Sequence, residues 1–186
     1  MKVLVIVDMQ NDFVTGTLGT KEAQAIVPNV IEKVKHAEEN GDTVVFTQDT
    51  HESNYMNTKE GRALPVKHCI EGTDGWTIVP ELSDFPKNTR IFQKNTFGSK
   101  NLANFLSDKY IEAVSIDDKL KVEFVGLCTG ICVISNVLLT KAFIPEAEII
   151  VDSSCCACVT PESHTNALKA MKMCQIDIIN DGGALK

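Results

Sequence analysis

The chain has 186 residues, a formal net charge of −7 at pH 7 and a hydrophobic fraction of 44%. These values predict one soluble domain over 1–186, and the scattered Lys and Arg residues argue against nucleic acid as a partner. No apolar run is long enough to predict a membrane span, and the N-terminus lacks a signal-peptide pattern. The seven cysteines are an odd number without a secretion signal, so we expect free thiols in a reducing cytoplasm.

Apolar runs typical of buried strands alternate with helical patterns along most of the chain. We expect strands at 2–7, 43–47, 90–93, 122–127, 147–151 and 176–179. We expect helices from Pro28 to Gly41, around Leu102–Leu106 behind a Ser99 cap, at 131–142 and at 161–173. Residues 110–116 read as helix with a strand left open, and 52–88 read as a long functional loop.

This alternation predicts an α/β fold, with helices on both faces of a parallel sheet. In such folds, ligands bind outside the carboxyl ends of the strands. Four polar sites follow predicted strands: Asp8, Asp49 with His51, Lys94 and Cys132. We therefore expect these side chains to meet at one edge of the sheet.

Residues 122–136 read as a strand, a sharp turn and a helix that carries Cys132 on its first turn. A helix N-terminus lowers a thiol pKa and offers free N–H groups, so Cys132 is a candidate nucleophile. Cys128 more readily offers its backbone N–H. The alternative is that both are ordinary buried cysteines.

Asp8 and Lys94 could serve such a nucleophile. A buried carboxylate with a raised pKa can take a proton from a thiol, and a nearby ammonium stabilises the thiolate. The alternatives are that Asp8 caps a turn and that Lys94 is an ordinary surface lysine.

Asp49, His51 and His68 could bind a divalent metal, since two imidazoles and a carboxylate suit Zn, Fe or Mn. The alternative is an Asp–His hydrogen bond with a second, unrelated histidine. The cluster Cys155, Cys156 and Cys158 lacks ligand spacing, so we favour packing over metal binding there.

Five segments resemble the isochorismatase-like cysteine hydrolases, most closely the nicotinamidase branch. They are Leu4-Val-Ile-Val-Asp-Met-Gln-Asn-Asp-Phe13, Thr47-Gln-Asp-Thr-His51 with Leu64-Pro-Val-Lys-His-Cys-Ile-Glu-Gly-Thr73, Phe92-Gln-Lys94, and Gly126-Leu-Cys-Thr-Gly-Ile-Cys-Val133. The resemblance implies a three-layer α/β/α fold with a six-stranded parallel sheet, and a catalytic triad of Asp8, Lys94 and Cys132. It also implies homo-oligomers.

The resemblance implies further site residues. A divalent metal would bind Asp49, His51, His68 and, as a variable fourth ligand, Glu60. The backbone N–H groups of Cys128 and Cys132 would form the oxyanion hole, after a cis bond between Leu127 and Cys128. The substrate pocket would be lined by Phe13, Leu18, Phe97 and Ile131. Gly130 departs from the family, which often has Asp there, and this leaves the exact amide open.

The sequence thus predicts a cysteine-dependent amidohydrolase that needs no organic cofactor. Conversion of nicotinamide to nicotinate and ammonia, through a thioester, is the best single substrate hypothesis. The alternatives are a related hydrolase of a carbamoyl or ureido amide, and a non-catalytic binding protein with this fold.

Overall fold

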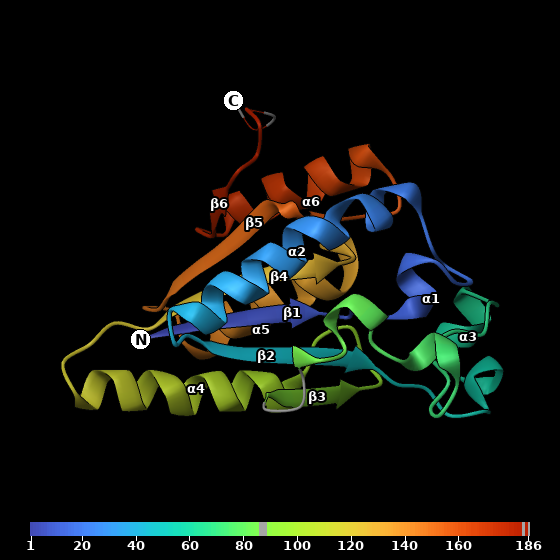
Figure 1. Ribbon diagram of the computed structural model, residues 1–186, viewed down its shortest axis with the longest axis horizontal. Helices are drawn as coiled ribbons and strands as arrows, with labels where there is room; N and C mark the ends of the chain where they lie inside the picture. The colour runs from blue at the N-terminus through green and yellow to red at the C-terminus, as the bar shows by residue number, and fades with distance from the viewer. Residues whose placement is uncertain (86–88, 184, 186) are drawn as a thin grey trace.

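A computed structural model of the chain describes residues 1–85, 89–183 and 185. Its centre is a six-stranded, all-parallel sheet with the order β3-β2-β1-β4-β5-β6 (Figure 1). The strands are Lys2–Val7 (β1), Thr43–Asp49 (β2), Arg90–Lys94 (β3), Lys121–Leu127 (β4), Glu148–Ala157 (β5) and Asp177–Ile179 (β6). The predicted α/β class and parallel sheet are confirmed.

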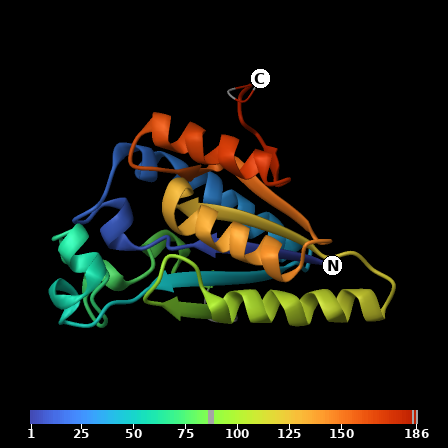
Figure 2. The same cartoon turned by 180° about the vertical axis from the view of Figure 1, so that it is seen from behind.

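Helices cover both faces of this sheet, which makes three layers (Figures 1 and 2). The longer helices are Lys21–Glu39 (α2), Lys100–Ser115 (α4), Ile134–Phe143 (α5) and Pro161–Met173 (α6). Buried side chains of α2 join one core cluster, and those of α4, α5 and α6 join the other. Two short helices, Asn11–Val14 (α1) and Lys59–Ala63 (α3), lie beyond the carboxyl ends of β1 and β2 (Figure 1). None of the helices in the described residues is long and apolar enough to cross a membrane.

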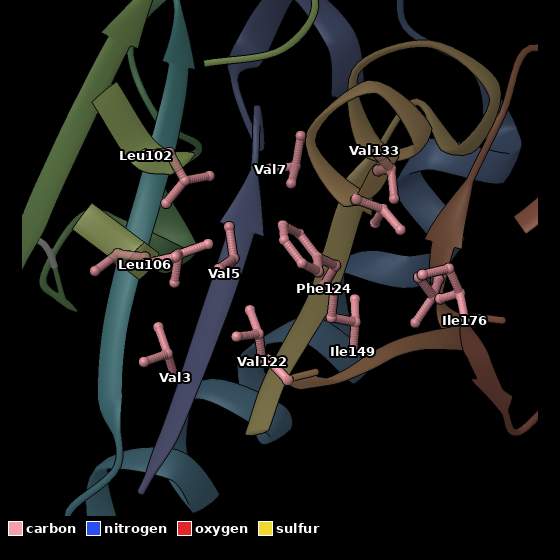
Figure 3. Packing of buried hydrophobic residues seen from close by; sticks show 14 of the residues in the cluster. Val3, Val5, Val7, Leu102, Leu106, Val122, Phe124, Val133, Ile149 and Ile176 are labelled. Atoms are coloured by element: carbon pink, nitrogen blue, oxygen red, sulfur yellow. The ribbon is translucent and has the colours of Figure 1, made fainter. Parts of the chain in front are cut away.

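The strand β1 shows how the apolar run produces two cores. Val3, Val5 and Val7 point to the cluster with α4 and α5, where Phe124 and Leu106 pack beside them (Figure 3). The alternate residues of the strand belong to the cluster beneath α2. A strand buried on both faces has to be apolar at every position, which explains its continuous run.

The helix predicted to begin at Pro28 begins instead at Lys21. Thr20 caps it, since its Oγ1 accepts a hydrogen bond of 3.0 Å from the N–H of Ala23. Pro28 lies inside the helix, where a proline removes one N–H donor. The buried face that α2 presents to the sheet, with Val30 and Val34 fully buried, outweighs that local cost.

Other element boundaries also differ from the expectation. The fifth strand continues past Asp152 to Ala157, with an irregular register opposite β4. Residues 110–115 continue α4, so the strand alternative there is wrong. The described part of 52–88 contains α3 and short 3₁₀ turns rather than unbroken loop. The predicted cap at Ser99 is confirmed, and Thr160 caps α6.

Candidate active site

Three side chains from different strand ends meet at the carboxyl edge of the sheet. Lys94, the last residue of β3, places its Nζ 2.7 Å from Oδ2 of Asp8, which directly follows β1. The same Nζ lies 3.5 Å from Sγ of Cys132. All three side chains are buried. The parallel order of the strands brings these residues together although they are far apart in the sequence.

Burial dominates the proton equilibria of this group. It raises the pKa of Asp8 more than the neighbouring Lys94 lowers it. Burial alone would lower the pKa of Lys94, but the neighbouring Asp8 and Asp49 carboxylates raise it, so the amine stays protonated as an ammonium. A carboxylate with a raised pKa is a stronger base, and the fixed cation beside it holds it in place.

The resting pKa of Cys132 corrects the sequence-based expectation. We expected the helix N-terminus to lower it, but burial and then the Asp8 charge raise it well above the usual value. Lys94 offsets only part of this rise. The resting nucleophile is therefore a thiol, hydrogen-bonded to Asp8, and it needs a base to become a thiolate.

The turn that carries Cys132 is not an ordinary helix start. After the cis bond between Leu127 and Cys128, residues Thr129–Val133 form a π-helical turn, and α5 follows at Ile134. The helix expected to begin at 131 therefore begins earlier and in another geometry. The Cys128 carbonyl accepts hydrogen bonds from the N–H groups of Ile131 and Val133, at 3.0 and 3.1 Å.

Several buried polar residues that hold this site were not predicted. Thr47, fully buried in β2, donates a hydrogen bond of 2.6 Å from its Oγ1 to Oδ1 of Asp8. Asn136 donates from Nδ2 to the Cys132 carbonyl at 2.8 Å and to the Phe97 carbonyl at 3.1 Å. A signal for both was available, since Thr47 lies in an apolar strand and Asn136 lies in a helix with an apolar majority.

Gln10 and Asp12 fix the neighbouring loops. Gln10 accepts a hydrogen bond from the Asp49 N–H at 2.7 Å and donates to the Asp49 carbonyl at 2.9 Å. Asp12 Oδ2 accepts from the Cys69 N–H at 2.8 Å, next to His68. Both residues lie in the opening segment that carries Asp8, so that segment also orders Asp49 and His68.

Asp49, His51 and His68 bring one potential ligand atom each within 4.8 Å of one another, and all three are buried. Nδ1 of His68 donates to the Val66 carbonyl at 2.9 Å, which leaves Nε2 with a free lone pair. Nε2 of His51 is buried without an aligned hydrogen bond, although Asp49 Oδ2 is 3.0 Å away. An orphaned imidazole nitrogen and a fixed second imidazole beside a carboxylate suit a divalent metal.

Glu60 lies at the open side of this set. Its Oε1 is 3.8 Å from Nε2 of His51 and 3.8 Å from Nε2 of His68. Although burial raises the pKa of Asp49, His51 beside it and then the Lys94 charge lower it by more, so its carboxylate is ionised. The four predicted metal residues are thus neighbours, with Glu60 the most exposed of them.

A cavity of about 640 Å³ opens beside Lys94, His51 and Glu60. Phe13 lies near it, with its ring centroid 5.6 Å from that of His68. The described residues that line the cavity do not include Phe13, Leu18, Phe97 or Ile131. Phe97 and Ile131 are partly exposed near Cys132, and the four-residue substrate pocket stays a prediction.

The cluster Cys155, Cys156 and Cys158 does not form a metal site. Cys155 packs into the core beneath α2, whereas Cys156 packs into the opposite core. Successive strand residues point to opposite faces, so these thiols cannot bind one ion. Among the described residues, the only group with metal-ligand geometry is Asp49, His51 and His68. All seven cysteines are free.

Comparison with known proteins agrees with this geometry. The family model for the Isochorismatase domain matches residues 2–180. A relative from Arabidopsis thaliana, named "Probable inactive nicotinamidase", is 30% identical, over 91% of this chain and 87% of that protein.

Two crystal structures share the fold over nearly their whole length. The pyrazinamidase/nicotinamidase of Streptococcus mutans superposes with a TM-score of 0.82 at 26% identity, covering 96% of this chain and 100% of that one. The pyrazinamidase of Pyrococcus horikoshii, in complex with zinc, gives a TM-score of 0.80 at 28% identity, covering 96% and 98%. The predicted six-stranded fold and family resemblance are confirmed.

Proposed function

We propose that this chain, which belongs to the isochorismatase family, hydrolyses a small amide through a thioester on Cys132, with nicotinamide as the leading substrate. The contact of Lys94 with both Asp8 and Cys132 carries this proposal. It supplies a base, a cation and a nucleophile in one buried group. Similarity to proteins named as nicotinamidases and pyrazinamidases supports the substrate class.

The reaction begins with proton transfer from Cys132 to Asp8. The Lys94 ammonium stabilises the thiolate as it forms, and the thiolate attacks the amide carbonyl carbon. The backbone N–H groups of Cys128 and Cys132 are the proposed donors to the oxyanion. Asp8 then gives its proton to the departing ammonia, which leaves an acyl thioester on Cys132.

The thioester is hydrolysed by water. Asp8, now a carboxylate again, accepts a proton from the attacking water and returns it to the Cys132 sulfur as the C–S bond breaks, so the acid product leaves and the thiol is restored. Burial raises the pKa of Asp8, which makes its carboxylate a stronger base for these steps. No step requires an organic cofactor.

We further propose that Asp49, His51 and His68, with Glu60 as a fourth ligand, hold a divalent ion such as zinc. The buried, unpaired Nε2 of His51 supports this, as does the zinc complex of the Pyrococcus protein. A bound ion would supply a Lewis-acid contact for a ring nitrogen or a water.

The direct test is Cys132→Ala, assayed by ammonia release from nicotinamide and from a panel of carbamoyl and ureido amides. We expect the variant to lose activity to background, since the other residues cannot form the thioester. Cys174→Ala is the matched control, because Cys174 is exposed and outside the site. Full activity in Cys132→Ala would overturn the mechanism.

The panel also separates the alternatives. Gly130, where the family often has Asp, leaves a different amide as the second candidate, and preference for a ureido substrate would establish it. A non-catalytic role is the third candidate, given the name of the Arabidopsis relative. Failure of the unmodified protein on the whole panel would favour that role.

A further inference from the structure

The first turn of α6 lies against the back of the oxyanion loop, which we define as residues 128–130. Thr129 is fully buried, and its Oγ1 lies 2.8 Å from Nδ1 of His164. A Cβ added to Gly130 would lie 3.3 Å from Sγ of Cys158. The absence of a side chain at Gly130 therefore leaves room for the Cys158 sulfur directly beside the loop backbone.

Cys128 and Cys158 occupy matching places on neighbouring parallel strands. The register pairs Leu127 with Ala157, the last residues of β4 and β5, and each cysteine directly follows the end of its strand. Neighbouring strands lie about 4.8 Å apart, within the Cα separation of roughly 4.4–6.8 Å that a disulfide needs. The two thiols are neighbours that shift each other's pKa, upward for Cys128 and downward for Cys158, and both are free.

Neither thiol has another role in the proposed chemistry. Cys128 contributes through its backbone N–H, and Cys158 does not contact the triad residues in any described interaction. A metal role is also unsupported, since only the Asp49 group has metal-ligand geometry among the described residues. A pair of adjacent free thiols behind a catalytic loop remains to be explained.

We propose that Cys128 and Cys158 form a reversible disulfide in the presence of a peroxide, and that this bond switches off the active site. The inhibitory part rests on the proposed amidase function, whereas formation of the bond does not. The site would thus be a point of oxidative modification, distinct from the nucleophile Cys132.

The reaction needs one peroxide molecule for each bond. The neighbouring Cys128 thiol, followed by the backbone N–H groups of Gly130 and Val159, lowers the pKa of Cys158 to about 5, so it is a thiolate at neutral pH. The thiolate attacks one peroxide oxygen, which becomes a sulfenic acid on Cys158 while hydroxide leaves. The Cys128 thiol then displaces that oxygen as water, so two thiols and one hydrogen peroxide give a disulfide and two waters.

Forming the bond has to move the oxyanion loop. Two neighbouring sulfurs must approach to about 2.05 Å to form the bond. Cys158 is buried and faces the N–H groups of Gly130 and Val159, whereas Cys128 is partly exposed. Cys128 therefore takes up the movement, and its N–H leaves the position that serves the oxyanion. A misplacement of about 1 Å in a catalytic group can cost roughly a hundredfold in rate.

The bond is tested first by mass spectrometry on Cys132→Ala, in which Cys128 is the only cysteine of the tryptic peptide 122–141. After hydrogen peroxide treatment and alkylation, we expect this peptide to be joined to peptide 142–169 and released by dithiothreitol. Cys132→Ala/Cys158→Ser should lose this link, and Cys132→Ala/Cys174→Ser should keep it. Absence of the link in Cys132→Ala, or its persistence without Cys158, overturns the proposal.

The switch is tested by activity in proteins that retain Cys132. We expect peroxide to lower the activity of the unmodified protein at least about tenfold, in line with loss of an oxyanion donor, and dithiothreitol to restore it. Cys158→Ser should keep its basal activity and resist the same exposure. If circular dichroism shows that the serine variant is unfolded, Cys158→Ala replaces it in the same assay. A complete link with unchanged activity overturns the switch. Absence of amidase activity before treatment overturns the proposed function instead. In that case the linked peptides still show whether the disulfide forms.

Discussion

The hydroxyl of Thr47 donates a hydrogen bond of 2.6 Å to Oδ1 of Asp8, while Oδ2 of the same carboxylate faces Lys94 at 2.7 Å. Each oxygen of Asp8 therefore has its own partner. The hydroxyl orients the carboxylate and, as a donor to its charged form, lowers its pKa against the effect of burial.

We predict that Thr47→Val lowers kcat about tenfold or more, since hydrogen bonds to charged groups contribute roughly 1.5–3 kcal/mol. It should also raise the pKa of Asp8, so the acid limb of the kcat/KM profile moves to higher pH. In the unmodified protein that limb already lies above pH 3.8, because burial raises the pKa of Asp8 from this value.

Thr47→Ser is the matched control, because it keeps the hydroxyl. Measured pH–rate profiles should place it close to the unmodified protein. Equal profiles for the valine and serine variants would show that Thr47 does not act on Asp8.

The metal proposal predicts a change in stoichiometry rather than only in rate. Metal-free protein supplied with zinc should bind one ion per chain, and His51→Ala or His68→Ala should each lose most of this binding, because each removes an imidazole ligand. His36→Ala is the control, since His36 is exposed on α2. Elemental analysis after desalting measures the ion, and unchanged zinc content in both variants would contradict the assignment.

A buried charge network on the α2 face gives a stability prediction. Nζ of Lys33 lies 2.5 Å from Oδ2 of Asp152 and 2.8 Å from Oε1 of Glu123, and both carboxylates are buried. Lys33→Met leaves the buried Asp152 without a cation, whereas Glu123 keeps its contact of 2.9 Å with Nζ of Lys2. We therefore expect a loss of about 3–5 kcal/mol in the free energy of unfolding. Urea denaturation at neutral pH measures the loss.

Lys35→Met is the control for that experiment. The Lys35 contact with Glu32 is exposed, and such pairs contribute at most about 1 kcal/mol. Similar losses in both variants would contradict the network.

The same network predicts a pH dependence of stability. Burial raises the pKa of Asp152, but Lys33 and the Ser154 hydrogen bonds lower it by more, so the pKa lies below 3.8. The stabilisation by this pair should therefore be present above pH 3.8 and disappear as the pH falls below it.

Gly126 gives a second stability prediction. Its φ is +114°, and an added Cβ would lie 2.2 Å from the carbonyl oxygen of Val7, the residue before Asp8. We expect Gly126→Ala to destabilise the fold by more than about 3 kcal/mol, because both the backbone conformation and the contact oppose a side chain.

Gly41→Ala separates these two effects. Gly41 has a φ of +72° but no atom within 4 Å of an added Cβ, so only the backbone cost of about 1–2 kcal/mol applies. Thermal unfolding of both variants gives the comparison, and equal shifts in Tm would exclude the contact with Val7 as a cause.

The sequence was sufficient to predict the strands and the residues that meet at their ends. Continuous apolar runs identify strands buried on both faces, and a polar residue directly after such a run lies at the sheet edge. Asp8, Lys94 and Cys132 were found in this way, and the structure brings them together.

The features that the sequence could not predict depend on tertiary contacts. The cap at Thr20 was overlooked because Pro28 looked like a helix start, and only packing on the sheet shows why α2 tolerates it. The pKa of Cys132 depends on burial by segments distant in the sequence. The matching positions of Cys128 and Cys158 depend on the register between β4 and β5.

The position of β3 in the sheet has a consequence for how the protein would lose activity. This strand is five residues long and lies at the edge, so it pairs with β2 on one side only, and yet it supplies Lys94. Edge elements open locally at a lower free energy than the centre of a sheet. Fraying of β3 would withdraw the cation while the other strands stay folded. Heat or mild denaturant should thus abolish catalysis before the bulk of the secondary structure is lost, so that activity reports the integrity of one short strand.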